Sequence, residues 1–167
     1  YGFHGTSHRY VSARALEFLG MKAEGTKVVT AHIGNGGSLA AVVDGKCVDT
    51  TMGLTPLEGV MMGTRSGDID GGAVAFIQKK LGLDADGISD LLNKKSGIAG
   101  LTGLSSDMRD IENAANAGNE RAQIAQDSYF YRIKKYVGAY AAAMGRIDVL
   151  VFTAGVGENQ TPMREDV

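Results

Sequence analysis

The feature that most limits the possible folds is the order of the strand-like segments along the chain. Residues 27–33, 38–43 and 47–51 follow one another closely and have the composition of strands, whereas residues 148–153 form a fourth such segment much later. Asp44-Gly45, between the second and third segments, is the strongest short signal for a hairpin. The sequence therefore predicts an antiparallel three-strand meander, connected through helices to a buried fourth strand, which is an α/β arrangement.

Apolar residues at helical spacing account for most of the remaining chain. The predicted helices cover residues 8–19, 72–81, 88–95, 107–117 and 120–144, and a further helix begins near Thr161. Thr6 or Ser7 is expected to cap the first helix, and Gly20 to end it. Because no internal repeat or linker divides the chain, we treat residues 1–167 as a single domain.

Three glycine-containing segments lack helical or strand periodicity and are predicted to be loops. They cover residues 52–70, 97–106 and 155–159. A loop as long as residues 52–70 is uncommon in a compact domain unless it has a function. Residues 155–159 follow the last predicted strand, and ligands of α/β proteins often bind beyond the carboxyl ends of strands. We therefore expect a binding loop there.

Composition excludes several classes of function. The 17 Lys and Arg residues nearly balance the 19 Asp and Glu residues, which leaves a net charge of −2. Because the chain lacks a strongly basic surface and an apolar stretch of the roughly 20 residues that span a bilayer, we expect neither nucleic acid nor a membrane as a partner. The single cysteine, Cys47, cannot form an internal disulfide, which favours a cytoplasmic location. Since the chain begins with Tyr1 rather than Met, we expect it to be part of a longer protein.

Glycine makes up 24 of the 167 residues, about twice the usual ~7%. Residues 32–38 (HIGNGGS) join the first two predicted strands, and glycines there allow consecutive N–H groups to point into one concavity that suits a phosphate chain. The alternative is an ordinary hairpin turn, since Asn-Gly is the commonest such turn. The segment lacks the third glycine of the dinucleotide fingerprint, so the pattern alone leaves both possibilities open.

Two histidines and one arginine are candidates for chemistry. His4 and His8 have the i, i+4 spacing of a metal pair, but a cap at Thr6 or Ser7 would place His4 before the helix, so we do not expect the two imidazoles to share a face or to hold a metal. Arg65 lies between two glycines, where its guanidinium is able to clamp an anionic group. The alternative is a surface arginine paired with Asp68 or Asp70.

Six segments, taken together and in order, resemble the acetate kinase family. They are residues 3–8 (FHGTSH), 32–38, 52–59 (MGLTPLEG), 63–70 (GTRSGDID), 105–110 (SSDMRD) and 152–159 (FTAGVGEN). The resemblance implies an α/β, ribonuclease-H-like domain of the acetate and sugar kinase/Hsp70/actin superfamily, in which two domains close over a nucleotide. Residues 1–167 would form most of the second, nucleotide-binding domain, without the first domain and the extreme C-terminus.

The same resemblance implies roles for individual residues. His4 and Arg65 are implied to stabilise the phosphoryl group during transfer, and Phe3 and Pro56 to line the apolar pocket for the acyl group. The residues implied to bind the nucleotide phosphates are His32, Ile33, Gly34, Asn35 and Gly36. Those implied to contact the ribose and adenine are Asp107, Met108, Arg109, Gly155, Val156, Gly157, Glu158 and Asn159.

The implied reaction is the reversible phosphorylation of acetate by ATP, giving acetyl phosphate and ADP, with magnesium (Mg2+) bound by ligands outside this chain and a homodimer as the whole protein. Because the family's other essential groups, an aspartate, an arginine and a magnesium-binding glutamate, lie outside residues 1–167, we do not expect this chain alone to turn over. A propionate or butyrate kinase, and a non-catalytic nucleotide-binding relative, remain alternatives. Gly37 and Gly71 depart from the family pattern without removing a catalytic group.

Overall fold

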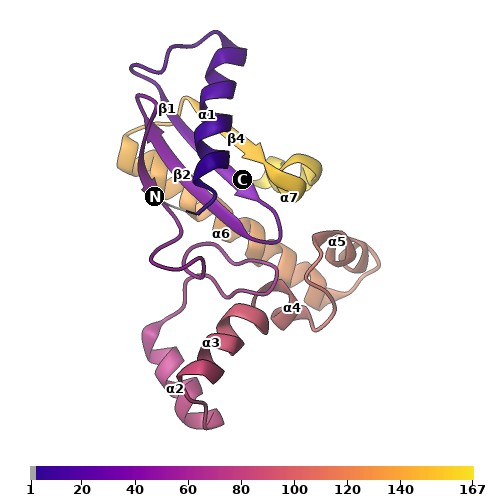
Figure 1. Cartoon of the computed structure of the whole chain (residues 1–167). Coiled ribbons are helices and arrows are strands. Elements are labelled where there is room, and N and C mark those ends of the chain that lie inside the picture. The colour runs from indigo at the N-terminus through magenta and orange to yellow at the C-terminus, as the bar shows by residue number, and fades with distance from the viewer. Residues whose placement is uncertain (1–2) are drawn as a thin grey trace.

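A computed structural model describes residues 3–167 as a four-stranded sheet with helices on both faces (Figure 1). The strands are β1 (Lys27–Ile33), β2 (Gly37–Val43), β3 (Lys46–Thr50) and β4 (Val149–Thr153). The helices are α1 (Gly5–Leu19), α2 (Gly71–Leu81), α3 (Ala85–Lys94), α4 (Gly97–Thr102), α5 (Met108–Asn116), α6 (Glu120–Met144), α7 (Ala154–Asn159) and α8 (Thr161–Asp166). The predicted α/β class is confirmed.

The sheet contains the predicted meander and adds β4 at its far side. The strand order is β3-β2-β1-β4, with β1 antiparallel to β2, β2 antiparallel to β3, and β4 parallel to β1. Asp44 and Gly45 connect β2 to β3 with φ values of 51° and 73°. Positive φ at both central residues is what a type I′ hairpin turn requires, so the Asp-Gly signal is confirmed.

Strand β1 is buried on both faces because it lies in the middle of the sheet between two helical layers. Helix α6 packs on one face with Val29, Ala31 and Ile33 of β1, and α1 packs on the other with Val28 through Leu16. Figure 1 shows α1 in front of the strands and α6 behind them. Such two-sided coverage explains why residues on both faces of β1 are buried, although Lys27, Thr30 and His32 interrupt its apolar sequence.

The long segment between β3 and α2 is a loop, as predicted, but it is fixed to the rest of the fold. Asp68 N–H donates to the Gly59 carbonyl (2.8 Å), while the Asp68 carboxylate accepts from Gly59 N–H (2.8 Å) and from the Tyr136 hydroxyl (2.6 Å). Met62 N–H donates to the carbonyl of Arg65 (3.1 Å). These bonds hold the loop in one shape beside the sheet.

Two predicted loops contain helices instead. Residues 97–102 form α4 and residues 154–159 form α7. Each has two glycines in six residues, which lowers the intrinsic helix propensity, so tertiary contacts decide its structure. In α4, Ile98 is completely buried and its N–H donates to the Met62 carbonyl (3.0 Å), which anchors the helix to the long loop.

Helix α1 begins earlier than predicted and without the predicted cap. It starts at Gly5, after His4 in a left-handed conformation (φ 56°, ψ 21°), and no side chain caps it. The Ser7 hydroxyl lies 2.8 Å from His32 Nδ1 and is therefore engaged across the sheet rather than with the helix backbone. The prediction of a Thr6 or Ser7 cap is wrong because the helix already begins at Gly5, which places both residues inside its first turn.

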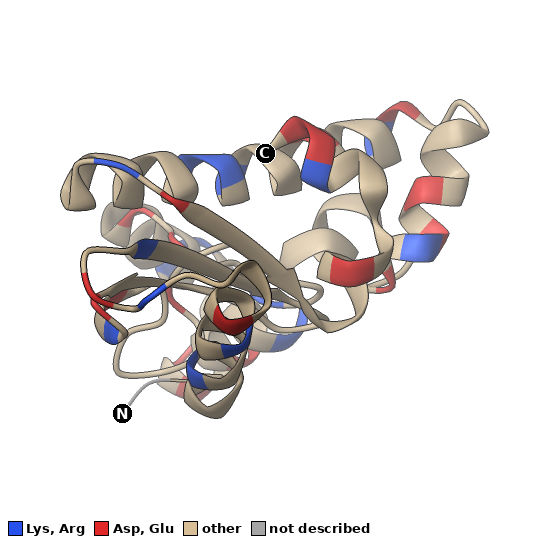
Figure 2. Ribbon diagram, turned by 90° about the horizontal axis from the view of Figure 1, so that it is seen from above, with Lys and Arg blue, Asp and Glu red and all other residues tan. Residues whose placement is uncertain are grey.

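Charged residues are spread over the molecule without a large single-sign area in the view of Figure 2, where Lys and Arg alternate with Asp and Glu along the helices. Among residues 3–167, no helix is long and apolar enough to cross a membrane.

Substitution of Gly97 would test how tightly α4 is anchored to the long loop. Its φ is +61°, and a Cβ there would clash with the Met62 carbonyl oxygen and lie 2.8 Å from that of Arg65. Gly103, at the other end of α4, has φ +69° but open space around it. We expect Gly103→Ala to lower the unfolding free energy by about 1 kcal/mol through left-handed strain, and Gly97→Ala by roughly 2 kcal/mol more through the clash. Urea unfolding followed by circular dichroism would measure both, and equal losses would contradict the anchoring.

Candidate functional site

A cavity of about 760 Å³ opens where the β1–β2 loop, the start of α5 and the end of β4 meet. Its lining residues are Gly34, Asn35, Gly63, Ser106, Asp107, Met108, Arg109, Glu112, Tyr129, Gly155, Val156, Asn159 and Gln160. A volume in this range suits a ligand of nucleotide size. The structure thus brings together three segments that the sequence singled out separately.

The β1–β2 loop forms one wall of the cavity through its backbone. Gly34 N–H donates to the Gly36 carbonyl (2.9 Å), and Gly63 N–H donates to the Asn35 carbonyl (3.1 Å). A Cβ on Gly63 would clash with Asn35 Oδ1, so Gly63 allows the long loop to approach closely. The segment is more than an ordinary hairpin turn, because it is held against a second loop and lines a cavity.

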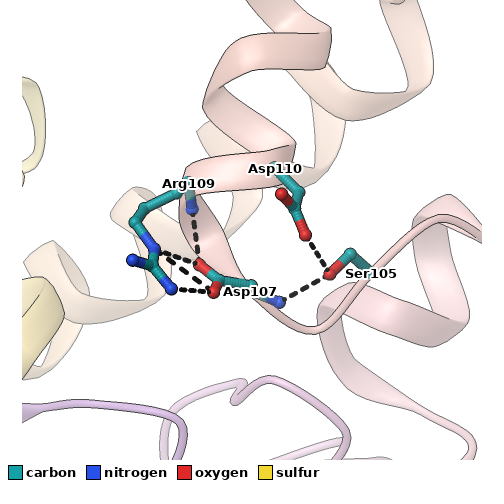
Figure 3. A network of polar contacts seen from close by, with 4 residues as sticks. All are labelled: Ser105, Asp107, Arg109 and Asp110. Atoms are coloured by element: carbon teal, nitrogen blue, oxygen red, sulfur yellow. Dashed lines mark hydrogen bonds and ion pairs between the residues drawn. The ribbon is translucent and has the colours of Figure 1, made fainter.

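The start of α5 forms a second wall (Figure 3). Asp107 caps the helix by accepting from Arg109 N–H (2.9 Å) and also binds the Arg109 guanidinium, with 2.5 Å from Nη2 to Oδ2. The Ser105 hydroxyl accepts from Asp107 N–H (3.0 Å) and donates to Asp110 Oδ2 (2.7 Å). Hydrogen bonds from Arg109 hold the pKa of Asp107 at about 2, so this carboxylate is ionised at neutral pH. The segment is both a helix cap and part of the cavity.

The third wall comes from α7, which begins directly after β4. Ala154 turns the chain with a positive φ of 66°. Gly155, Val156 and Asn159 then face the cavity, and Asn159 Nδ2 donates to the Gly155 carbonyl (2.8 Å). The predicted binding loop is therefore a short helix at the carboxyl end of a strand, which is the position where α/β proteins bind ligands.

Five residues implied to bind the nucleotide lie beside the cavity rather than in its lining. Ile33 is completely buried in the core, and Gly157 is buried against β1. Glu158 is exposed, 3.3 Å from the Thr153 hydroxyl. Gly36 lies against the guanidinium of Arg65, and His32 is stacked on His4.

Arg65 is directed toward the β1–β2 loop. Its Nη1 donates to the Pro56 carbonyl (2.8 Å), and its guanidinium is close enough that a Cβ on Gly36 would lie 3.5 Å from Nη2. The alternative of an ion pair with Asp68 or Asp70 is wrong: Asp68 accepts from Gly59 and Tyr136, and Asp70 caps α2. In the described part of the chain, the guanidinium has no carboxylate partner and keeps its charge for an anion.

Three histidines gather beside Arg65. His4 and His32 are stacked with ring centroids 3.9 Å apart and an interplanar angle of 18°. His4 Nδ1 and His8 Nε2 both lie within hydrogen-bond distance of the Ser38 hydroxyl, at 2.8 and 2.7 Å. His4 precedes α1, as expected, but the expectation that its imidazole and that of His8 would not share a face is wrong, because both rings approach the same oxygen.

Burial determines the charge of these histidines. Removal from water lowers the pKa of His4, and the nearby His32 and Arg65 lower it further. Burial, with smaller effects from His4 and His32, lowers the pKa of His8 to about 4. Burial also lowers the pKa of His32. At neutral pH the lowered pKa values favour the uncharged form of each ring, in which it acts as a hydrogen-bonding group rather than as a cation.

The two residues implied to form the acyl pocket lie in different surroundings. Phe3 lines a second cavity, of about 730 Å³, together with His4 and His8, between α1 and the sheet. Pro56 lines neither of the two cavities, and its carbonyl holds Arg65. Both residues therefore lie next to the His4 and Arg65 group, but residues 3–167 do not enclose them together.

The described residues do not form a metal centre of their own. No group of three or more His, Cys, Asp or Glu side chains within residues 3–167 is arranged to hold a metal ion. Two carboxylate residues, Asp107 and Glu112, line the first cavity, and Asp107 is already held by Arg109. The donor set present does not fit a protein-bound Mg2+ site.

Five residues of the cavity lining were not identified as site residues from the sequence. They are Gly63, Ser106, Glu112, Tyr129 and Gln160. Glu112 lies one helical turn after Met108, a signal available once α5 is recognised. Tyr129 belongs to the buried side of α6 and reaches the cavity only through the tertiary fold. Gln160 has a completely buried amide without a partner among the described residues, so other atoms of this residue line the cavity.

The neutral state of His8 predicts a pH dependence of stability. An unfolded chain protonates this histidine below about pH 6.5, whereas the folded chain keeps it neutral down to about pH 4. The unfolded state thus binds more protons in this window, and stability falls as pH falls. Between pH 6.5 and 5 we expect the unfolding free energy to drop by roughly 1.5 kcal/mol more than in His8→Gln.

Urea titrations at the two pH values would measure this difference. The window lies above the range in which most carboxylates titrate, and both proteins contain His4 and His32. Equal pH dependence in the two proteins would show that His8 is not held neutral.

Comparisons with known proteins cover the whole chain. The model of the acetokinase family matches residues 1–167. The acetate kinase of Bacteroides thetaiotaomicron is 67% identical over all 167 residues of this chain, which correspond to 42% of that protein. The chain therefore spans less than half the length of the curated relatives that it matches.

Solved structures of two similar proteins have the same fold as this chain. A crystal structure of Porphyromonas gingivalis acetate kinase matches 99% of this chain with a TM-score of 0.98 and 63% identity, over 42% of that chain. A structure of a propionate kinase from Francisella tularensis matches 99% of this chain and 42% of its own, with a TM-score of 0.93 and 45% identity. With the family model matching end to end, and relatives this similar, the chain belongs to the acetokinase family.

Proposed function

We propose that this chain is the nucleotide-binding part of an ATP-dependent acetate kinase, which converts acetate and ATP to acetyl phosphate and ADP and also runs in reverse. The observation that carries the proposal is the position of the 760 Å³ cavity, which ends at Asn35 beside the Gly36 backbone and the Arg65 guanidinium. A nucleotide placed in the cavity would direct its terminal phosphate toward an unpaired cation and two stacked imidazoles.

The reaction requires little covalent chemistry from the protein. An acetate oxygen forms a bond to the γ-phosphorus while the bond from that phosphorus to the bridging oxygen of ADP breaks, and ADP leaves with the bonding electron pair. The transferred group carries charge on its equatorial oxygens, so positioned N–H donors and cations stabilise it. Arg65 offers two parallel N–H bonds and neutral His4 offers one. The backbone N–H groups of Asn35 and Gly36 would bind the phosphates, since the Gly34 N–H already donates to the Gly36 carbonyl.

Magnesium would accompany the nucleotide phosphates in the whole protein. Because the donor set of residues 3–167 does not fit a magnesium site, we assign it no ligand and no step here. A ribonuclease-H-like superfamily assignment, a place as the second domain, a homodimeric whole protein and a cytoplasmic location remain predictions from the sequence.

A propionate kinase is the second candidate, because the Francisella tularensis propionate kinase has the same fold over this region. The acyl pocket separates the two possibilities, and Phe3 and Pro56 are not enclosed together within residues 3–167. Comparing kcat/KM of the full-length protein for acetate, propionate and butyrate tests the proposal, and a preference for propionate over acetate would reject acetate as the natural substrate.

Arg65 is predicted to act mainly in the transition state. In the full-length protein, Arg65→Ala should lower kcat by about 10³ or more, by analogy with other arginines that stabilise a transferring phosphoryl group. Arg121→Ala, which removes an exposed arginine at the start of α6, is the matched control and should leave kcat unchanged. An Arg65→Ala protein that is folded and retains most of its kcat would exclude this role.

Gly155 tests the nucleotide cavity separately from the transfer step. It lines the cavity and has open space for a side chain, so Gly155→Leu should leave the fold intact and occupy the ligand space. We expect KM for ATP to rise roughly tenfold, which is about 1.4 kcal/mol, with KM for acetate within twofold. Gly71→Leu, at the equally open start of α2, is the control. Equal effects on both substrates would place the nucleotide elsewhere.

A further inference from the structure

A continuous row of hydrogen bonds connects the interior of the sheet to His4. The Thr30 hydroxyl lies 2.7 Å from His8 Nδ1, His8 Nε2 lies 2.7 Å from the Ser38 hydroxyl, and that hydroxyl lies 2.8 Å from His4 Nδ1. Thr30 and Ser38 are completely buried, and His8 is only 5% exposed. The role proposed for His4 uses only the last of these four groups.

The position of each hydrogen follows from the number of donors available. Ser38 has one O–H, so it can donate to only one of its two imidazole partners, and the other imidazole must donate to it. The Thr30 hydroxyl has one partner within the described residues, His8 Nδ1, and it is satisfied as a donor only if that nitrogen carries no hydrogen. Neutral His8 then has its hydrogen on Nε2 and donates to Ser38.

Ser38 must in turn donate to His4 Nδ1, which leaves the hydrogen of neutral His4 on Nε2. Two other arrangements are possible, and each leaves a completely buried hydroxyl without an acceptor. If Ser38 donates to His8, the Thr30 hydroxyl has no acceptor. If both imidazoles donate to Ser38, the Ser38 hydroxyl has none. An unsatisfied buried donor is costly, which excludes both arrangements. His4 Nε2 has no partner within residues 3–167, so its N–H is free for a ligand.

We propose that Thr30, His8 and Ser38 are positioning residues that fix His4 in the Nε2–H tautomer, so that it always presents an N–H donor to an anionic oxygen. In the proposed function, on which this use of the donor rests, the acceptor is an oxygen of the transferring phosphoryl group. With its hydrogen on Nδ1, the same ring would present a lone pair and repel that oxygen.

Two further observations support a fixed His4. The low pKa of His8 keeps the middle ring neutral, as the row requires, because a charged ring would donate from both nitrogens. His4 is also held in a left-handed conformation that only a few per cent of non-glycine residues adopt, and its ring is stacked on His32, which the Ser7 hydroxyl holds at 2.8 Å. Backbone, stacking and hydrogen bonds together determine one orientation.

The tautomer is directly measurable. In the ¹⁵N-labelled full-length protein near pH 7.5, long-range proton–nitrogen correlations distinguish a ring nitrogen that carries a hydrogen from one that does not. The signals of His4 are identified by their loss in His4→Gln. We expect hydrogen on Nε2 and none on Nδ1. Hydrogen on Nδ1, a mixture of the two tautomers or a charged ring would overturn the proposal.

A matched pair of variants tests the origin of the effect. Thr30→Val keeps the shape of the side chain but removes its hydroxyl, whereas Thr30→Ser keeps the hydroxyl. In Thr30→Val, either tautomer of His8 leaves its Nδ1 without a partner, so the preference for one tautomer is lost and His4 should become a mixture of both tautomers. We expect kcat to be about tenfold lower and KM for ATP to stay within twofold. Thr30→Ser should retain the single tautomer and most of kcat.

A Thr30→Val protein with an unchanged tautomer and unchanged kcat would overturn the proposal. If this variant does not fold, the measurement on the unmodified protein still decides the tautomer. The nuclear magnetic resonance result does not depend on activity. A protein with the expected tautomer but without acetate-dependent turnover would therefore reject the proposed function and leave the positioning role supported.

Discussion

The pairing of β1 with its two neighbours is the constraint on which the rest of the structure depends. β1 is antiparallel to β2 through Ile33 and Gly37, and parallel to β4 through His32 and Thr153. This register places the β1–β2 loop and the start of α7 at the same edge of the sheet, where both reach one cavity. It also places Ser38 opposite His32, so that histidines from α1 and β1 meet over β2. A slip of one residue between β1 and β2 would place Thr30 and Ser38 on opposite faces of the sheet.

The long loop between β3 and α2 brings Arg65 to the same edge of the sheet. Several hydrogen bonds fix its position: Asp68 bonds with Gly59 and with Tyr136 of α6, and helices α4 and α3 bond to the backbone before and after Arg65. Because the carbonyls of Pro56 and Met62 are also occupied, the loop has few polar groups left to rearrange. A rigid arginine favours phosphoryl transfer, since a preorganised charge does not need to move during the reaction.

Much of this arrangement could be predicted from the sequence, because it depends on local chemistry. The Asp44-Gly45 turn, the meander and the long apolar side of α6 follow from residue type and spacing, and the glycine-rich segments mark the walls of the cavity. Helices α4 and α7 could not be predicted, since glycines lower their propensity and tertiary contacts form them. The same reason applies to Ser7, whose hydroxyl binds His32 rather than capping a helix, and to Tyr129, which reaches the cavity only through packing of α6. Local signals identify the segments, but only the folded sheet shows which groups face each other.

The parallel pairing of β1 with β4 has a consequence for how the chain folds during synthesis. Lys27 bonds with Asp148 across 121 residues of sequence. At roughly 5–20 residues per second, a ribosome needs about 6–24 s to reach β4 after it has completed β1. Until β4 is made, the β1 edge of the meander has no partner strand, and such an edge is a template for pairing with another chain. The free edge of β1 is therefore open to aggregation from the completion of the meander until β4 emerges, and a chaperone that covers this edge would have its greatest effect in that interval.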